Sequence, residues 1–178
     1  LLPASQSRDK SAVSGQALTR VCRDLRPDFD FILIDSPAGI EQGFQLAIAP
    51  ADDVIIVTTP ELPAVQDADR VIGLLEQAKK PTPRLIINRM RPNMVRRKDM
   101  LSTPDVLELL GIPLLAVIPE DEGVIVATNR GEPAVLSPKS TAGQAYRDAA
   151  RRLLGDDVPV AADRQTESLV QRLLHLFR

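Results

Sequence analysis

The sequence predicts an α/β protein in which helices flank a mostly parallel sheet, in three layers. Short apolar runs of strand length alternate with longer segments whose apolar residues recur at helical spacing. Four of these runs are almost continuously apolar, which is typical of parallel strands covered by helices on both faces. Each run also ends in polar or turn-forming residues, as expected where a buried strand reaches the surface.

The first third of the chain contains two of the expected strands. Helical spacing predicts a helix over 15–25, which the proline at position 27 ends. The run Phe31-Ile32-Leu33-Ile34-Asp35 predicts a buried strand over 31–35. A short helix is expected over 41–49, and a second buried strand over 53–58.

The remaining two thirds continue the alternation. We expect a long helix over 63–79, a strand over 84–89, a helix over 104–110 that Gly111 caps, a strand over 114–118 and a last body helix over 141–154. Residues 1–154 then form the body, 155–166 a linker and 167–178 a separate amphipathic helix.

Parallel strands share one carboxyl edge, so the polar residues that follow the four strands are expected on one rim. These are Asp35-Ser36-Pro37, Thr59-Pro60-Glu61, Asn88-Arg89 and Pro119-Glu120-Asp121. Such convergence is typical of a nucleotide-sized site. In nucleoside-triphosphate hydrolases a strand-end carboxylate such as Asp35 holds Mg²⁺, usually through water. The alternative is an ordinary turn after the strand.

The composition excludes several classes of site. The chain of 178 residues is 44% apolar and 26% charged, which is ordinary for a globular protein. Its net charge of −2 gives no general attraction to nucleic acid. It has one cysteine, Cys22, and one histidine, His175. An intramolecular disulfide, a Ser-His-Asp or Cys-His site and a thiol or imidazole metal site are therefore not expected.

The motifs, taken in order, resemble those of the MinD septum site-determining ATPases in the ParA/MinD group of deviant P-loop proteins. The matching stretches are 2–6, 31–43, 58–61, 65–70, 88–102, 117–121 and 128–133. The resemblance implies an ATP- and Mg²⁺-dependent ATPase that forms a homodimer with ATP and helps to position the division septum. It also implies a peripheral location on the cytoplasmic face of the bacterial membrane, MinC-like and MinE-like regulators, and no specific nucleic acid.

The resemblance implies roles for the strand-end residues. Asp35 would hold Mg²⁺ through water, and Gly39 would offer its amide to the γ-phosphate. Asn88 would hydrogen-bond adenine through its planar amide, beside Arg89. The other wall of the base pocket would be Pro119, Glu120 and Asp121, mostly through backbone groups. The alternatives are a strand-end cap at Asn88 and a helix cap at Glu120-Asp121.

Acidic residues near the start of the helix over 63–79 are expected to face partners. The resemblance places Asp67 near the signature lysine of the phosphate loop in the ATP-bound dimer, with Glu61 and Asp69 facing regulators. For these two the alternative is a solvated helix start. The basic residues Arg89, Arg91, Arg96, Arg97 and Lys98 are interpreted as a solvated loop, since no aromatic residue is present among them to stack on bases.

The printed sequence departs from the family pattern at one point. It contains no glycine-rich phosphate loop with its lysines, and the first switch is also absent. Leu1-Leu2 resembles the end of a strand, so we expect the chain to be the C-terminal portion of the ATPase domain. Without that loop we expect it to lack hydrolytic activity on its own.

The last twelve residues predict a membrane-surface helix over 167–178. The residues predicted to contact the membrane are Leu169, Val170, Arg172, Leu173, Leu174, Leu176, Phe177 and Arg178. At 100° per residue their apolar members fall on one side, while the two arginines can meet anionic headgroups. The alternative is a helix docked on the protein's own core.

Other functions stay open at this point. A flagellar-placement relative would share the fold and the tail, and a ParA-type partition ATPase would bind DNA without sequence preference. A different class is a non-catalytic adaptor that packs against partners.

Overall fold

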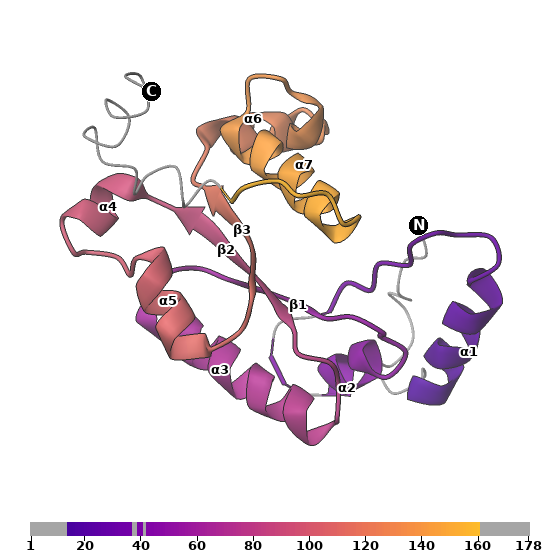
Figure 1. Cartoon of the computed structure of the whole chain (residues 1–178). Coiled ribbons are helices and arrows are strands. Elements are labelled where there is room, and N and C mark those ends of the chain that lie inside the picture. Colours follow the sequence, from indigo (N-terminus) through magenta and orange to yellow (C-terminus); the bar gives the residue numbers. More distant parts are fainter. Residues whose placement is uncertain (1–13, 37–38, 41, 161–178) are drawn as a thin grey trace. The chain divides into compact units, whose positions relative to one another are not determined.

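The computed structural model describes residues 14–36, 39–40 and 42–160. It divides into two compact units, Leu1–Val54 and Ile55–Arg178 (Figure 1). The first unit contains two described helices, and the second contains the sheet with its covering helices.

The first unit pairs helix α1 (Gly15–Leu25) with helix α2 (Gln42–Ile48). Ser14 caps α1, because its Oγ accepts a hydrogen bond from the amide of Ala17 at 3.1 Å. Cys22 is buried on α1, and Phe44 and Ala47 are buried on α2. The predicted helix over 15–25 is thus confirmed, and the one predicted over 41–49 is confirmed over its described part.

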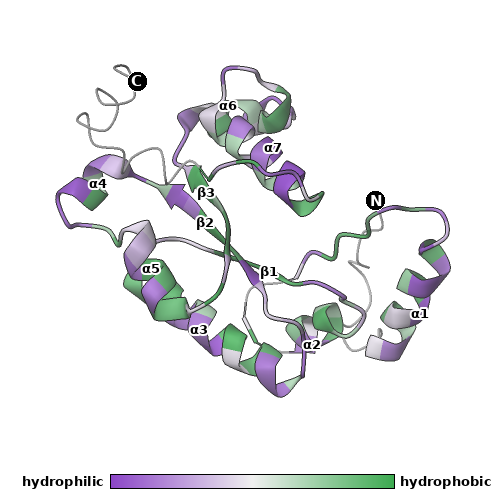
Figure 2. Ribbon diagram, viewed as in Figure 1, coloured by the Kyte–Doolittle hydropathy of each residue, from purple (hydrophilic) through white to green (hydrophobic). Residues whose placement is uncertain are grey.

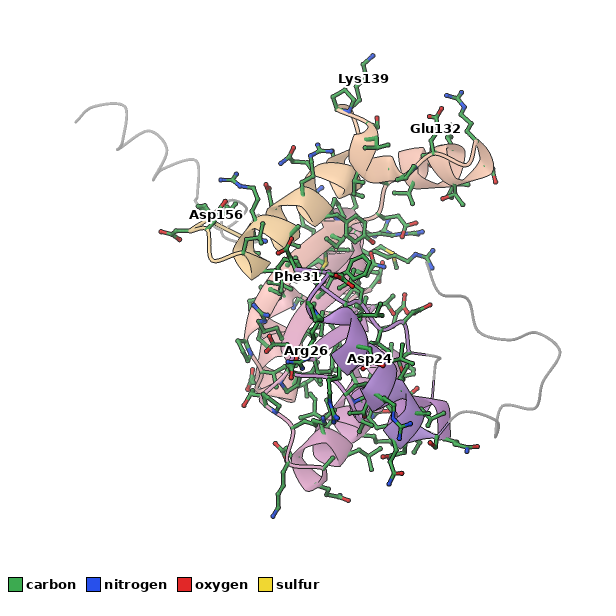
Figure 3. The ribbon with its side chains drawn as sticks, turned by 90° about the vertical axis from the view of Figure 1, so that its right-hand side faces the viewer. Asp24, Arg26, Phe31, Glu132, Lys139 and Asp156 are labelled. Atoms are coloured by element: carbon green, nitrogen blue, oxygen red, sulfur yellow. The ribbon has the colours of Figure 1, made fainter. Side chains whose placement is uncertain are left out.

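The strand predicted over 31–35 is not formed. Residues 31–36 have no strand structure, and Phe31 (labelled in Figure 3) and Leu33 are 62% and 88% exposed. A buried parallel strand needs hydrogen-bonded neighbours and a helix layer on each face. Among the described residues this run has no strand partner. Its apolar composition alone therefore does not make it a strand.

The second unit is built on a three-stranded parallel sheet. Strands β1 (Ile55–Thr58), β2 (Arg84–Met90) and β3 (Leu114–Pro119) lie in the order β1-β2-β3. Ile56 pairs with Leu85, and Ile87 pairs with Val117. The parallel sheet and three of its four predicted strands are confirmed.

Helices cover both faces of this sheet, so the unit has three layers (Figure 1). The elements on one face are α3 (Leu62–Gln77) and α5 (Thr103–Leu110), and those on the other are α6 (Glu122–Asn129), the 3-10 helix η2 (Ala134–Leu136) and α7 (Thr141–Leu153). On the α7 face, a buried cluster joins Ile86, Ala116 and Ile118 of the strands to Ala142 and Ala149 of the helix.

Local sequence chemistry accounts for several boundaries in the second unit. Ser102 and Asp105 form a reciprocal capping box at the start of α5. Gly111 ends that helix with φ of 63°, in the left-handed region that glycine adopts without strain. Gly143 lets α7 approach η2 closely, since a Cβ there would collide with the carbonyl oxygen of Ala134.

Residues 155–160, the first part of the predicted linker, lie against the body through Arg152. The Arg152 guanidinium donates to the carbonyl oxygens of Val158 (2.6 Å), Pro159 (2.7 Å) and Leu115 (2.9 Å). Asp156, labelled in Figure 3, pairs with Arg151 at 2.9 Å. Residues 161–166 and the predicted helix over 167–178 lie outside the described residues. Within the described part of the chain, no helix is both long and apolar enough to cross a bilayer.

Candidate functional site

The carboxyl ends of β1, β2 and β3 meet along one edge of the sheet, which we call the rim. The rim comprises Thr59-Pro60-Glu61, Asn88-Arg89 and Pro119-Glu120-Asp121. Strand β2 changes from hydrophobic to hydrophilic as it reaches this edge (Figure 2). Three of the four predicted clusters therefore lie together. The fourth, at Asp35, belongs to the first unit.

A β-bulge at the end of β2 shapes the rim. Ile87 pairs with Val117 and Met90 with Pro119, so Asn88 and Arg89 together oppose the single residue between those partners on β3. Arg89 has φ of 58°, a left-handed conformation that costs a non-glycine residue about 1 kcal/mol. Bulges re-aim side chains and are frequent beside active sites. The bulge therefore sets the directions of the Asn88 and Arg89 side chains.

Arg89 forms an ion pair with Glu120 across β2 and β3. Its Nε donates to Glu120 Oε2 at 2.8 Å, and Arg91 Nε lies 3.8 Å from the same oxygen. The hydrogen bond from Arg89 lowers the pKa of Glu120, and the same bond raises the pKa of Arg89. The amide of Glu120 donates to the carbonyl of Met90 at 2.9 Å. Glu120 therefore stays ionised and has its backbone amide engaged.

Asn88 is half-buried, and its side-chain oxygen meets two donors. The backbone amide of Arg89 lies 3.0 Å from Asn88 Oδ1, and the hydroxyl of Tyr146 on α7 lies 3.4 Å from it. Sequence reasoning did not select Tyr146. The available sequence clue was modest: it is the single tyrosine of the chain and lies in the expected helix over 141–154.

Asp121 joins the starts of two helices. Its Oδ1 accepts from the amide of Gly123 at 2.8 Å, which caps α6. Its Oδ2 accepts from Ser140 Oγ (2.7 Å), Thr141 Oγ1 (3.2 Å) and the amide of Ala142 (3.1 Å) at the start of α7. These bonds, led by the one from Ser140, lower the pKa of Asp121 to about 2. The helix-capping alternative therefore describes what this carboxylate contacts.

Pro119 precedes this pair of acids at the end of β3. It is half-buried and pairs with Met90 across the sheet. Together with Glu120 it forms the β3 side of the rim, opposite Asn88 and Arg89 on β2.

Asp35 and Gly39 belong to the first unit, and both are exposed. Gly39 has φ of 95°, which a residue with a side chain would rarely adopt. One carboxylate suits Mg²⁺, because this ion keeps several waters and takes few protein ligands alongside phosphate oxygens. The described residues contain no group of three or more His, Cys, Asp or Glu side chains that would form an all-protein metal cage.

The predicted partner-facing acids lie at the start of α3. Glu61 precedes the helix, and its Oε2 accepts from Thr59 Oγ1 at 2.6 Å. Asp67 pairs with Arg70 at 3.2 Å, and both are exposed. Asp69 is exposed and lines a groove of about 380 Å³ between α3 and α5. All three acids are thus accessible at the surface of the second unit.

The basic stretch predicted as a solvated loop contains a short helix, α4 (Pro92–Arg96). Proline at the first helical position favours this turn, because its fixed φ suits the helix and its missing N–H is not needed there. Arg97 pairs with Asp99 at 3.0 Å, and both side chains remain mostly exposed. The prediction of solvent exposure holds for these residues, while the prediction of a loop is wrong over 92–96.

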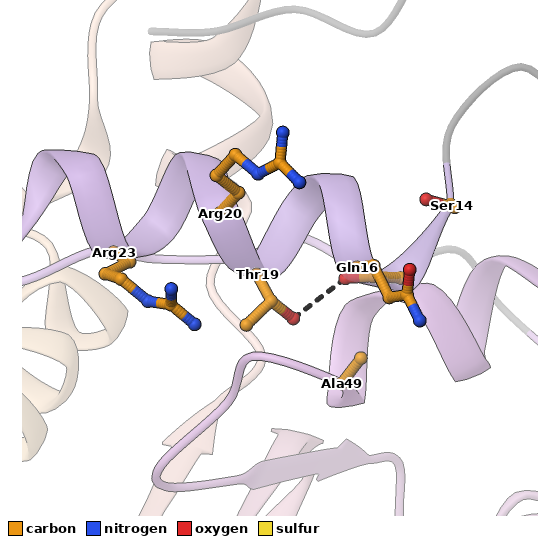
Figure 4. Close-up of a pocket in the computed structure, with 7 residues that line it drawn as sticks. Ser14, Gln16, Thr19, Arg20, Arg23 and Ala49 are labelled. Atoms are coloured by element: carbon orange, nitrogen blue, oxygen red, sulfur yellow. Dashed lines mark hydrogen bonds between the residues drawn. The ribbon is translucent and has the colours of Figure 1, made fainter.

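The first unit has a separate hollow of about 820 Å³ beside α1 (Figure 4). Its lining residues are Ser14, Gly15, Gln16, Thr19, Arg20, Arg23 and Ala49. Thr19 donates to the carbonyl of Gly15 within the helix at 2.8 Å. The lining is mainly the polar surface of one helix, and none of the residues predicted to bind nucleotide belongs to it.

Comparison with known proteins decides the family. A family model of the ParA group, described as NUBPL iron-transfer P-loop NTPase, matches residues 10–154. The chain is 50% identical over 160 residues to the septum site-determining protein MinD of Synechocystis, and 42% identical over 179 residues to that of Bacillus subtilis. The chain belongs to the ParA/MinD family of P-loop NTPases. The resemblance inferred from the motifs is therefore confirmed.

The MinD relatives are longer than this chain. The matches cover 89% of the chain and 60% of the Synechocystis MinD, and 99% of the chain and 67% of the Bacillus MinD. The chain thus spans about 60% of the length of the first of these relatives.

Solved structures of MinD proteins share the fold. The MinD cell division protein of Aquifex aeolicus has a TM-score of 0.80 at 43% identity, covering 83% of the chain and 64% of that protein. The MinC:MinD complex of the same organism has a TM-score of 0.79 at 44% identity, covering 83% and 62%. MinD of Pyrococcus horikoshii, solved with Mg-ADP, has a TM-score of 0.70 at 30% identity, covering 82% and 60%.

Proposed function

We propose that this chain is part of a MinD-type ATPase that uses ATP and Mg²⁺ to help position the division septum. The observation that carries the proposal is the match to septum site-determining MinD proteins along nearly the whole chain. It spans both units, and so includes the segment with Asp35 and the rim with Asn88. These are the two places where the family's magnesium and base contacts are expected.

The nucleotide is proposed to bind with its base at the rim. Asn88 supplies the planar amide, and Pro119 and Glu120 form the facing wall with Arg89 between them. The ion pair at 2.8 Å joins Arg89 of β2 to Glu120 of β3. Asp121 is proposed to support this wall by holding the starts of α6 and α7.

Two residues of the first unit, Asp35 and Gly39, are proposed to act on the metal and the phosphates. Asp35 would hold Mg²⁺ through water, and the amide of Gly39 would face the γ-phosphate. When bound, the metal would neutralise charge on the phosphate oxygens. The glycine-rich loop and its lysines are proposed to lie outside residues 1–178 in the natural protein. The chain as printed is then not expected to hydrolyse ATP, and Mg²⁺-dependent phosphate release by the purified chain would contradict this.

Dimerisation and regulation are proposed to use the exposed acids of α3. Asp67 would approach the signature lysine of the phosphate loop in an ATP-bound homodimer, while Glu61 and Asp69 face MinC-like and MinE-like regulators. The Aquifex MinD was solved in complex with MinC. The exposure of all three acids in the second unit is consistent with contacts to partners.

Asp35 provides the sharpest test of the proposed chemistry. In the full-length protein, Asp35→Ala should abolish Mg²⁺-dependent ATP turnover. Asp28→Ala is the matched control, because Asp28 is also exposed and also lies in the segment between α1 and α2. Turnover in Asp35→Ala equal to that of the control would reject the magnesium assignment.

The cellular role is tested by complementation. The full-length protein should restore septum position in a bacterium that lacks its own MinD, measured by microscopy, and Asp35→Ala should not. Failure of the wild-type protein to restore septum position, together with retardation of DNA at moderate salt, would favour a partition ATPase instead.

Membrane attachment is proposed to occur through 167–178 on the cytoplasmic face of the membrane. The test is sedimentation of the full chain with anionic vesicles. Leu173→Glu places a charge on the apolar side of the predicted helix, and Gln171→Glu places the same charge on its polar side. We expect the first variant to lose binding and the second to lose little. Equal loss in both would show that charge, and not the apolar face, controls binding.

A further inference from the structure

The one tyrosine of the chain connects α7 to the rim. Tyr146 is half-buried and packs against the cluster that joins the strands to α7. Its hydroxyl reaches Asn88 Oδ1 at 3.4 Å, 58 positions away in the sequence. A hydroxyl at the end of a ring held by the core is restricted in position, so this contact constrains the amide.

The two contacts at Asn88 Oδ1 decide which edge of the amide is free. The oxygen has two lone pairs, and it meets the Arg89 backbone N–H at 3.0 Å and the Tyr146 hydroxyl at 3.4 Å. The backbone amide can only donate, so the oxygen must face it. The NH₂ group then occupies the other edge of the amide and carries two donors.

We propose that Tyr146 is a positioning residue for base recognition, holding the Asn88 amide with its oxygen inward and its NH₂ edge presented to the nucleotide base. This inference rests on the proposed nucleotide function of the rim. It also specifies the ligand chemistry, since an NH₂ edge selects a heteroaromatic ring with an acceptor nitrogen, which adenine provides. The bulge at Asn88-Arg89 sets where this side chain points. The Arg89 N–H makes the oxygen the inward atom, and the Tyr146 hydroxyl holds the amide in that rotation.

The experiment separates base recognition from phosphate binding. In the full-length protein, Mg²⁺-ATP and Mg²⁺-tripolyphosphate, which has no base, are titrated by calorimetry. Tyr146→Phe keeps the ring and removes the hydroxyl. We expect its ATP affinity to fall by about three- to tenfold, the range for one net hydrogen bond, with tripolyphosphate affinity unchanged. Thr128→Val is the control, because Thr128 also loses a hydroxyl but donates only within α6.

A double-mutant cycle tests whether Tyr146 acts through Asn88. In an Asn88→Ala background, adding Tyr146→Phe should change ATP affinity no further. An ATP affinity of Tyr146→Phe equal to wild type would overturn the proposal. An equal loss for ATP and tripolyphosphate would also overturn it, because the effect would then be general.

A second measurement does not depend on nucleotide. In the NMR spectrum of the chain, the Asn88 side-chain NH₂ resonances should shift in Tyr146→Phe and stay in place in Thr128→Val. If the wild-type protein binds neither ligand, the proposed nucleotide function fails, and this measurement alone decides the contact. Unchanged Asn88 resonances in Tyr146→Phe would then reject the positioning role.

Discussion

Two apolar runs of similar composition have opposite surroundings in the two units. Leu85, Ile86 and Ile87 lie in β2, where the first and third are 0% exposed. In the first unit, the run 31–34 contains Phe31 at 62% and Leu33 at 88% exposure. The difference is one of pairing, because β2 lies between β1 and β3 and has helices on both faces.

The comparison shows that a buried strand is a property of its neighbours. Strand pairing satisfies the backbone groups, and only then can both faces be covered by helices. The run 31–34 has no strand partner among the described residues. An exposed apolar run of this kind is typical of a surface that another segment or molecule covers.

The largest expected effect tests the difference between the buried run in β2 and the exposed run 31–34. Ile87→Ala should lower the free energy of unfolding by about 2–5 kcal/mol, because it leaves a cavity in a fully buried site. Leu33→Ala should change it by about 0.5 kcal/mol or less, as at other exposed positions. Urea unfolding of both variants measures the difference. Equal losses would mean that Leu33 is covered in solution.

The Leu33→Ala measurement in the full-length protein tests whether the run 31–34 is covered there. If the proposed ATPase domain continues the sheet beside 31–35, Leu33 becomes buried there. The loss should then rise toward the range expected for Ile87→Ala. A loss that stays near zero would mean that the run remains exposed in the complete protein.

A smaller effect concerns the hydrogen bonds that Asp121 accepts at the starts of α6 and α7. These bonds have no counterpart among the described contacts of the first unit. Its pKa is lowered to about 2 from an ordinary value near 3.8. A lowered folded-state pKa contributes stability above the unfolded-state pKa, and this contribution disappears as the pH falls through the folded-state value. We therefore expect about 2 kcal/mol to be lost between roughly pH 4 and pH 2.

Asp121→Asn tests this assignment. Urea unfolding at pH 6 and at successively lower pH should show a shallower acid loss in the variant than in the wild type. The same acid loss in both would assign it to other carboxylates.

Two helical glycines in the second unit form a further matched pair of tests. Gly143→Ala should destabilise the protein by about 1–3 kcal/mol, because the new methyl group collides with the Ala134 carbonyl. Gly73→Ala should stabilise it by about 0.5–1 kcal/mol, since open space surrounds Gly73 within α3. Thermal unfolding measures both. A stabilising Gly143→Ala would show that α7 and η2 are not in close contact in solution.

Several features could be predicted from the sequence because they depend on local chemistry. Helical spacing defines 15–25, and Gly111 marks the end of α5. Apolar runs that do have neighbours, such as 84–89, became strands, and the rim followed from their parallel arrangement. The basic composition of this stretch does not distinguish a loop from the short helix over 92–96, although Pro92 suits the first turn of a helix.

The rest depends on contacts between distant residues. A left-handed arginine at position 89 has no local sequence mark, so the bulge was not predicted. Tyr146 reaches Asn88 only because α7 packs on the sheet. Asp121 was recognised as a potential helix cap, but its bonds to Ser140 and Thr141 required the position of a second helix.

The hydrogen bonds from Arg152 to the carbonyls of residues 158 and 159 also shorten the free part of the linker that precedes the chain's last segment. With residues 158 and 159 held by Arg152, seven residues, 160–166, separate that contact from the predicted helix over 167–178. Even fully extended, seven residues reach about 25 Å. Attachment through 167–178 would therefore confine the second unit to a thin layer beside the membrane. In the proposed ATP-bound dimer, two such segments would encounter the same patch of lipid at high effective concentration.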